Sequence, residues 1–369
     1  MRRAARPWLI ALGWFTLSRV IILGIGLVGA ATFVDQHDLA VAGPAALNLE
    51  AVWRKWDVLW YERIALYGYG WQIDTPQGQA AAAFFPLYPL IVGLLLGLLP
   101  FASFFWIGSA LSTLCTLAAA ALIVQSLTTG IEHARRTMLV LFTAAGSFYW
   151  SIPYTEGLFL LLIAAVMVLS RRRTYTWAFL IAGLAAVTRA QGLALVAVPA
   201  VACWMDPALT SRERWTRLAG GIALFAIPFA AYVMMLADLQ GSAQAFIERQ
   251  AMWDNPVPYP FRSVVGLLEH PTRLTSYLDA GFWVLYLGLL ARYRRRLLPG
   301  YLLFCLGALI ISTQQANFQG IYRYAAVLVP VTLAVAEDRA EWRLAFVLFN
   351  VIFGTIMILA FVTNNRLVV

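Results

Sequence analysis

Long apolar stretches separated by short polar segments make up most of the chain. A helix of about 20 apolar residues crosses the hydrocarbon core of a bilayer, so these stretches predict membrane-spanning helices. Two of them, 137–151 and 174–188, are short for a crossing, and we expect them to be enclosed by protein or to border a cavity. The pattern predicts an all-α polytopic membrane protein with about eleven spans, over residues 8–34, 102–124, 137–151, 154–170, 174–188, 191–205, 217–238, 277–291, 297–313, 321–336 and 343–363.

A further apolar stretch, residues 84–101, is predicted to lie in the outer leaflet without crossing. It begins Phe84-Phe85-Pro86-Leu87-Tyr88-Pro89, and prolines among aromatic residues favour an interfacial or re-entrant start. Residues 35–101 then form a first outer loop with interfacial helices, and residues 239–276 form a second long outer loop. We expect residues 1–369 to form one membrane domain.

The composition agrees with this architecture and excludes several classes of protein. Hydrophobic residues make up 62% of the 369 residues and charged residues only 12%, whereas soluble domains carry about 25% charged residues. A soluble enzyme, a disordered chain and a secreted disulfide scaffold are therefore excluded. A cleaved signal peptide is the alternative for residues 8–34, but that stretch is too long and Arg19 interrupts it.

The net charge of +9 indicates orientation in a membrane. All but one of the 27 basic residues are arginine, and most fall in short clusters between apolar stretches. This distribution follows the positive-inside rule, so we expect a cytoplasmic N-terminus, an outer C-terminus and a plasma-membrane location. Most acidic residues fall toward the outer side instead. Any chemistry is therefore predicted to face outward, and a nucleic-acid partner is not expected.

The segment 53–64 in the first outer loop predicts a short amphipathic helix. Trp53, Trp56, Trp60 and Ile64 fall on one helical face, which suits a helix lying flat at the headgroup level. Asp57 lies within it. That carboxylate is either solvated and paired with a neighbouring base (Arg54, Lys55 or Arg63) or a general base held at the membrane surface.

Glu156 and three arginines are the other polar candidates. An acid at the outer end of a span is costly, so Glu156 is either a structural partner of Arg189 or Arg19, or a residue that binds acceptor or supports Asp57. Arg189 and Arg323 lie outside the arginine clusters, and arginine binds phosphate bidentately. For Arg19, inside the first span, an internal ion pair is the favoured interpretation.

Five short motifs give the chain a resemblance to the PIG-V, or GPI mannosyltransferase 2, family and its bacterial relatives, which belong to glycosyltransferase superfamily C. One difference is Ala190, where the family usually has proline. The motifs are Trp56-Asp57-x-x-Trp60-Tyr61-x-x-Ile64-Ala65-x-x-Gly68-Tyr69, Ala83-Phe84-Phe85-Pro86-Leu87-Tyr88-Pro89-Leu90, Pro153-Tyr154-Thr155-Glu156-Gly157-Leu158-Phe159, Thr188-Arg189-Ala190-Gln191-Gly192 and Tyr322-Arg323-Tyr324.

The resemblance implies transfer of a sugar, usually mannose, from a polyprenyl-phosphate carrier to an acceptor hydroxyl, with inversion, on the outer side. It implies Asp57 as catalytic base and Glu156 as the second acidic residue, and no cofactor. We expect Arg323 and Arg189 to bind the donor phosphate. The partners implied are the polyprenyl-phosphate sugar, a lipid or glycan acceptor and membrane lipids. The aromatic residues expected to line the substrate site are Trp56, Trp60, Tyr61, Tyr88, Tyr154 and Tyr322.

Two alternatives stay open at this stage. A transporter or lipid flippase would be expected to have inverted repeats and acidic residues at the bilayer midplane, and neither pattern is visible. A membrane scaffold would leave the Trp-Asp-Trp-Tyr segment unexplained. Glucose or arabinose could replace mannose. The three histidines lie far apart in the sequence, so no histidine metal site is predicted.

Overall fold

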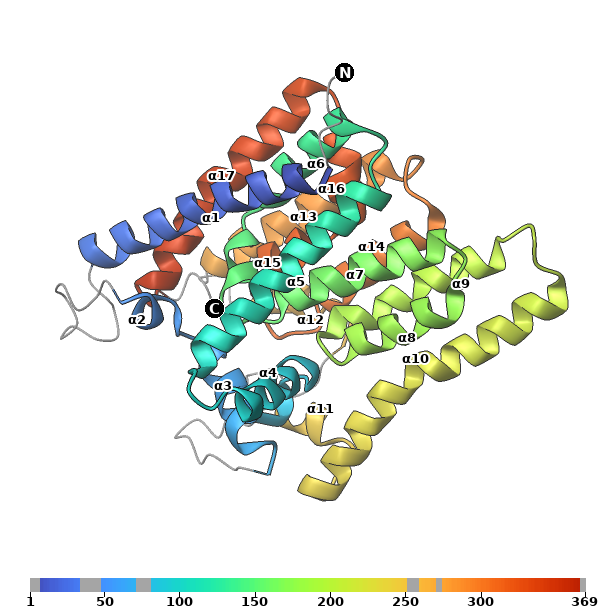
Figure 1. Ribbon diagram of the computed structural model, residues 1–369, viewed down its shortest axis with the longest axis horizontal. Helices are drawn as coiled ribbons and strands as arrows, with labels where there is room; N and C mark the ends of the chain where they lie inside the picture. The colour runs from blue at the N-terminus through green and yellow to red at the C-terminus, as the bar shows by residue number, and fades with distance from the viewer. Residues whose placement is uncertain (1–6, 34–47, 71–80, 251–258, 270–273, 366–369) are drawn as a thin grey trace.

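The computed structural model describes residues 7–33, 48–70, 81–250, 259–269 and 274–365, and every regular element in these ranges is helical (Figure 1). The α-helices are α1 (Pro7–Thr32), α2 (Leu49–Trp53), α3 (Asp57–Tyr67), α4 (Leu87–Leu98), α5 (Phe104–Ser126), α6 (Ile131–Phe142), α7 (Glu156–Arg171), α8 (Tyr175–Ala186), α9 (Ala197–Trp204), α10 (Ser211–Gln240), α11 (Ala245–Gln250), α12 (Arg262–Glu269), α13 (Leu274–Tyr293), α14 (Pro299–Ile311), α15 (Ile321–Ala326), α16 (Val329–Ala336) and α17 (Ala340–Val362). The 3₁₀ helices are η2 (Ala81–Ala83), η3 (Ser147–Ser151) and η4 (Ala190–Val196).

Four described helices, α1, α5, α10 and α17, are long and apolar enough to cross a membrane. Helices α1 and α17 lie side by side at one edge of the bundle, and α10 lies at the opposite edge (Figure 1). Helix α10 begins at Ser211, before the predicted span, because the Thr210 hydroxyl and the Glu213 carboxylate cap its first turn reciprocally. The protein is an integral membrane protein, while the number of about eleven spans stays a prediction.

Three of the predicted spans are interrupted. The stretch 137–151 divides into α6 and η3, the stretch 191–205 into η4 and α9, and the stretch 321–336 into α15 and α16. The first division occurs around Gly146, where a side chain would collide with the backbone of α15. Most side chains between residues 137 and 151 are buried, as expected for a stretch that protein encloses.

Helix α4 covers twelve residues of the stretch 84–101. At 1.5 Å per residue it is about 18 Å long, which is short of the roughly 30 Å of a bilayer core. It packs against α3 and α5, and its Gly93 lies against the backbone of Ala65 in α3. The described part of the predicted loop 35–101 therefore consists of α2, α3, η2 and α4. The described part of the loop 239–276 holds α11 and α12.

The predicted tryptophan-lined helix over residues 53–64 is partly confirmed: residues 57–64 are helical, but the helix does not continue across residues 54–56. Helix α2 ends at Trp53 and α3 begins at Asp57, and Trp56 between them has φ 58°, a conformation that L-residues rarely adopt. Trp53 is buried against Gly26 of α1 and against the rings of Phe148 and Phe361, with centroids 6.2 and 5.7 Å away. Burial among aromatic partners therefore replaces the expected position at the headgroup level.

Candidate active site

A cavity of about 530 Å³ lies where the first turns of α3 and α7 meet η2, η4 and the segment 311–320. Asp57, Arg189 and Arg323 are the charged side chains in its lining. The remaining wall combines aromatic side chains from several elements with amide side chains from η4 and the segment 311–320. The cavity therefore joins a charged region to uncharged polar and apolar surfaces.

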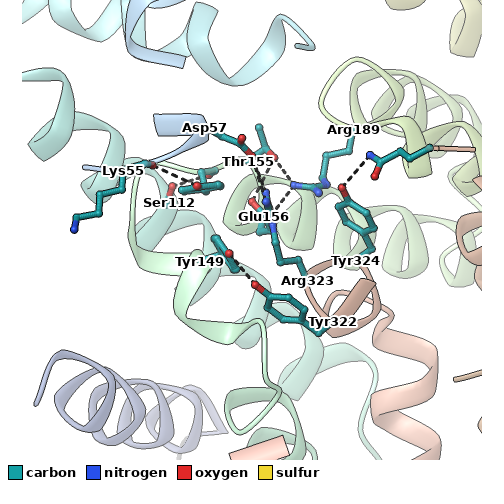
Figure 2. Close-up of polar contacts among 12 residues, drawn as sticks. Lys55, Asp57, Ser112, Tyr149, Thr155, Glu156, Arg189, Tyr322, Arg323 and Tyr324 are labelled. Atoms are coloured by element: carbon teal, nitrogen blue, oxygen red, sulfur yellow. Dashed lines mark hydrogen bonds and ion pairs between the residues drawn. The ribbon is translucent and has the colours of Figure 1, made fainter. Parts of the chain in front are cut away.

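Four charged side chains that are far apart in sequence form one cluster at this cavity (Figure 2). Arg323 Nε donates a hydrogen bond to Glu156 Oε1 at 2.8 Å, and Arg323 Nη2 forms an ion pair with the same oxygen at 2.8 Å. Its Nη1 and Nη2 both donate to Asp57 Oδ2 at 3.2 Å. Arg189 Nη1 forms an ion pair with Glu156 Oε1 at 2.7 Å and donates a hydrogen bond to the Thr155 hydroxyl at 2.7 Å. Two carboxylates thus neutralise two guanidinium groups, as buried charges require.

The two carboxylates differ in exposure. Glu156 is fully buried and lies behind the cavity wall. Asp57 lines the cavity, and its side chain is 30% exposed. Each is the first residue of its helix, Asp57 in α3 and Glu156 in α7. The positive end of the helix dipole stabilises a negative charge at such positions. The helix starts therefore both place and stabilise the two acids.

Helix α15, which carries Arg323, is anchored by a buried acid that sequence reasoning missed. The carboxylate of Asp279 accepts hydrogen bonds from the backbone amides of Gly320 at 2.9 Å and Ile321 at 2.7 Å. Gly320 has φ 65°, a left-handed conformation that suits glycine. Close packing of Gly146 against Arg323 fixes the other side of α15. Its position inside the apolar stretch 277–291 could have identified Asp279, because an acidic residue in such a stretch needs a partner or a function.

Aromatic rings frame the two arginines. The Arg323 guanidinium carbon lies 4.4 Å from the Tyr149 ring centroid and 4.9 Å from that of Tyr154. The Arg189 guanidinium carbon lies 4.9 Å from the Tyr324 ring centroid. Cation–π contacts of this kind stabilise and orient a guanidinium. Tyr149 was missed by sequence reasoning, and Tyr324 was noted only as part of the Tyr322-Arg323-Tyr324 motif.

Three of the six aromatic residues predicted to line the substrate site, Trp56, Tyr61 and Tyr154, line the cavity. The other three lie outside its lining and are buried in the core. Trp60 stacks on Phe84, the Tyr88 hydroxyl donates to the carbonyl of Gly108, and the Tyr322 hydroxyl shares a hydrogen bond with Tyr149. Trp60, Tyr88 and Tyr322 therefore shape the walls from behind.

The local partners considered for Asp57 are engaged elsewhere. Arg54 pairs with Glu62 at 2.6 Å, and Lys55 Nζ donates to the Val362 carbonyl at 2.6 Å. The guanidinium of Arg63 lies over the ring of Trp60. Asp57 pairs instead with Arg323, 266 residues away. Sequence spacing could not have revealed that partner.

The expected internal ion pair of Arg19 is wrong. Its Nη1 donates to the Ser147 carbonyl at 2.7 Å and to the Ser151 hydroxyl at 3.1 Å. Its guanidinium also lies near the rings of Phe15 and Phe142. The Ser147 carbonyl and the Ser151 hydroxyl thus take the place of an acidic partner at Nη1, while the buried Nη2 has no hydrogen-bond partner among the described residues. Glu156 forms its ion pairs with Arg189 and Arg323.

Metal ligands do not gather at the cavity. In the described ranges, no three His, Cys, Asp or Glu side chains come close enough together to hold a metal ion. The polar side chains that line the cavity include Asp57, the two arginines, the hydroxyl groups of Thr155, Thr188 and Ser312, and the amide side chains of the wall.

Comparisons with known proteins bear on both the family and the fold. The family model described as mannosyltransferase (PIG-V) matches residues 35–363. A comparison with curated protein sequences gave no match. Among solved structures, the chain is similar to ArnT from Cupriavidus metallidurans bound to undecaprenyl phosphate, with a TM-score of 0.51 and 15% identity. The alignment covers 89% of this chain and 60% of ArnT, so the chain spans about three-fifths of that structure.

At this low identity the likeness to ArnT shows a shared fold. The family match extends over nearly the whole chain and includes all four residues of the charged cluster. The chain therefore belongs to the PIG-V mannosyltransferase family.

Proposed function

We propose that the protein is a glycosyltransferase that moves mannose from a polyprenyl-phosphate carrier to an acceptor hydroxyl on the outer side of the plasma membrane, with inversion. The observation that carries the proposal is the cluster of Asp57, Glu156, Arg189 and Arg323 at the wall of the cavity. It supplies a carboxylate for the acceptor and guanidinium groups for a phosphate in one place.

Asp57 is the general base in this proposal. Its Oδ2 accepts from Arg323, while its Oδ1 accepts no hydrogen bond from the described residues, and its side chain is accessible from the cavity. A base must come within hydrogen-bond reach of the hydroxyl it deprotonates, and this exposure permits that approach. Glu156 is fully buried and committed to the two arginines, so its role is to hold them in position.

Arg323 and Arg189 bind the phosphate of the donor. Both line the cavity, and planar guanidinium groups match phosphate oxygens with paired hydrogen bonds. Asp57 takes the proton of the acceptor hydroxyl, whose oxygen bonds to the anomeric carbon. The bond from that carbon to the phosphate oxygen breaks on the opposite face, and the polyprenyl phosphate leaves with the electron pair. The arginines stabilise the negative charge that develops on it.

The apolar part of the wall suits the polyprenyl chain. Phe229 of α10, Phe246 and Ile247 of α11, and Ile311 of α14 line the cavity together with the charged residues. The solved ArnT structure was bound to undecaprenyl phosphate, which supports a carrier of this chemical class here. Outward orientation, with a cytoplasmic N-terminus, rests on the arginine clusters between the apolar stretches.

The test compares Asp57→Asn with Asp238→Asn, an exposed aspartate of α10 outside the cavity lining. Purified protein in liposomes is supplied with radiolabelled polyprenyl-phosphate mannose and a membrane lipid extract as the source of acceptor. We expect Asp57→Asn to lower transfer by at least about 100-fold, because general base catalysis typically contributes that much, and Asp238→Asn to leave it unchanged. Near-normal turnover by Asp57→Asn would refute the mechanism. Movement of the labelled lipid between leaflets without sugar transfer would indicate a transporter instead.

A further inference from the structure

A row of uncharged amide side chains lines the cavity and has no part in the reaction as described. We call it the amide wall, and it consists of Gln191, Gln314, Gln315, Asn317 and Gln319. Four of its members come from the segment 311–320, between α14 and α15. Each amide offers both donors and an acceptor without a charge. Such a surface is suited to a neutral ligand that is rich in hydroxyl groups.

Gln315 is the member whose hydrogen bonding is incomplete. Its Oε1 is buried and has no hydrogen-bond partner among the described residues. Its Nε2 makes one long contact of 3.5 Å with the Tyr324 hydroxyl. A buried polar atom without a partner costs free energy, so such atoms are rare in proteins and call for an explanation. The missing partner would most simply be a ligand group.

The orientation of the amide does not alter this conclusion. If its oxygen and nitrogen were exchanged, Oε1 would accept from Tyr324 and the NH₂ group would be left without a partner. The terminal torsion of glutamine is soft, so a small rotation can present either group to the cavity. A hydroxyl both donates and accepts, and it therefore satisfies Gln315 in either orientation.

The backbone beneath Gln315 is fixed, which means that the incomplete bonding does not arise from a loose segment. The Ser263 hydroxyl of α12 donates to the Gln315 carbonyl at 2.7 Å, and the Ser263 amide donates to the Thr313 carbonyl at 3.0 Å. The Thr313 hydroxyl in turn accepts from the Phe261 amide at 2.9 Å. Gly266 of α12 packs directly on the Ala316 carbonyl. Side chains on such a segment are held ready for a ligand.

We infer that the amide wall, through Gln315, binds hydroxyl groups of the sugar that is transferred. This inference rests on the proposed function. Gln315 contacts Tyr324, whose ring lies 4.9 Å from the guanidinium carbon of Arg189, the proposed phosphate ligand. The sugar is covalently attached to the donor phosphate, so it must lie beside the arginines. The amide wall therefore determines which glycosyl group the enzyme accepts.

The experiment measures the affinity of purified protein for polyprenyl-phosphate mannose, for the same donor lacking single sugar hydroxyls, and for bare polyprenyl phosphate. Gln315→Leu removes the amide at nearly constant size, and Gln125→Leu, an exposed glutamine of α5, is the matched control. We expect Gln315→Leu to weaken binding of the mannose donor about tenfold, as loss of one buried hydrogen bond does, and to leave binding of bare polyprenyl phosphate unchanged. Gln125→Leu should match the wild type with every ligand.

The deoxy donors separate recognition from folding. The wild type should bind one of the deoxy donors less tightly than the full donor. Gln315→Leu should bind these two donors with equal affinity, because the missing hydroxyl and the missing amide belong to the same hydrogen-bonded pair. The inference is overturned if Gln315→Leu weakens binding of bare polyprenyl phosphate as much as binding of the mannose donor. It is also overturned if Gln315→Leu still distinguishes the full donor from every deoxy donor as the wild type does. Either result leaves the proposed function standing. Failure of the wild type to bind either lipid overturns the inference and the proposed function together.

Discussion

Replacement of Glu156 by glutamine tests how far the charged cluster contributes to stability. The substitution keeps the shape of the side chain but removes a negative charge that forms an ion pair with Arg189 at 2.7 Å and accepts a hydrogen bond from Arg323 at 2.8 Å. Asp57 would then pair with Arg323, and Arg189 would have no acidic partner among the described residues. At an effective dielectric constant of about 20, each ion pair at this separation is worth about 6 kcal/mol before desolvation is subtracted. Breaking a buried pair has a net cost of about 3–5 kcal/mol, so we expect the free energy of unfolding to fall by that amount.

Glu132→Gln is the matched control for that measurement. Glu132 pairs with Arg136 at 2.7 Å, the same distance as Glu156 with Arg189, but both side chains are exposed. Unfolding in mixed micelles of increasing SDS content, followed by tryptophan fluorescence, compares the two variants with the wild type. We expect Glu132→Gln to unfold with the wild type, since exposed ion pairs contribute little. A loss of less than about 1 kcal/mol for Glu156→Gln would show that burial does not strengthen the cluster, and would refute the reasoning.

Two further substitutions test the helix that carries Arg323 and a cluster elsewhere in the bundle. In Gly146→Ala the new methyl group would lie 2.9 Å from Arg323 Cα, so we expect displacement of α15 and a loss of about 100-fold in the rate of sugar transfer. The control Gly24→Ala, which has open space around the new methyl group, should retain activity. Equal activities of the two variants would contradict this. Burial raises the pKa of Asp338, but hydrogen bonds from the Tyr293 hydroxyl, the Arg339 amide and the Arg292 guanidinium outweigh it, so the pKa is lowered. Asp338 therefore stabilises the fold above its unfolded pKa of about 3.9, and this contribution is lost as the pH falls through the lower folded value. Asp338→Asn should be less stable than the wild type at neutral pH and approach it below about pH 4 in thermal unfolding; a pH-independent difference would contradict this.

The charged residues of the candidate site could be predicted from the sequence, but their arrangement could not. Few charges lie outside the arginine clusters, so Asp57, Glu156, Arg189 and Arg323 were recognisable as exceptions in an apolar chain. Their mutual contacts join residues up to 266 positions apart. Periodicity and spacing report only on neighbours along one helix, so no pattern in one sequence could identify Arg323 as the partner of Asp57.

Local patterns also failed where tertiary packing overrides them. Residues 53–64 have the spacing of a continuous amphipathic helix, yet the chain turns at Trp56 so that Trp53 can pack under α1 and Asp57 can begin a new helix. The burial of a large aromatic side chain outweighs the cost of an unfavourable backbone conformation at one residue. The long spans 102–124 and 343–363 correspond closely to α5 and α17, since sustained hydrophobicity over more than 20 residues has no competing explanation.

The contact between Arg323 and Asp57 has a consequence for the order in which substrates bind. Before any lipid binds, the proposed base shares its Oδ2 with the arginine that is proposed to hold the donor phosphate. Arg323 holds the buried Glu156 at 2.8 Å and the more exposed Asp57 at 3.2 Å, so a phosphate would displace Asp57 at the lower cost. Arrival of the donor would then release the base, and the acceptor would be activated only afterwards. We expect compulsory-order kinetics with the donor first, so the resting enzyme is protected from deprotonating hydroxyl groups when there is no sugar to transfer.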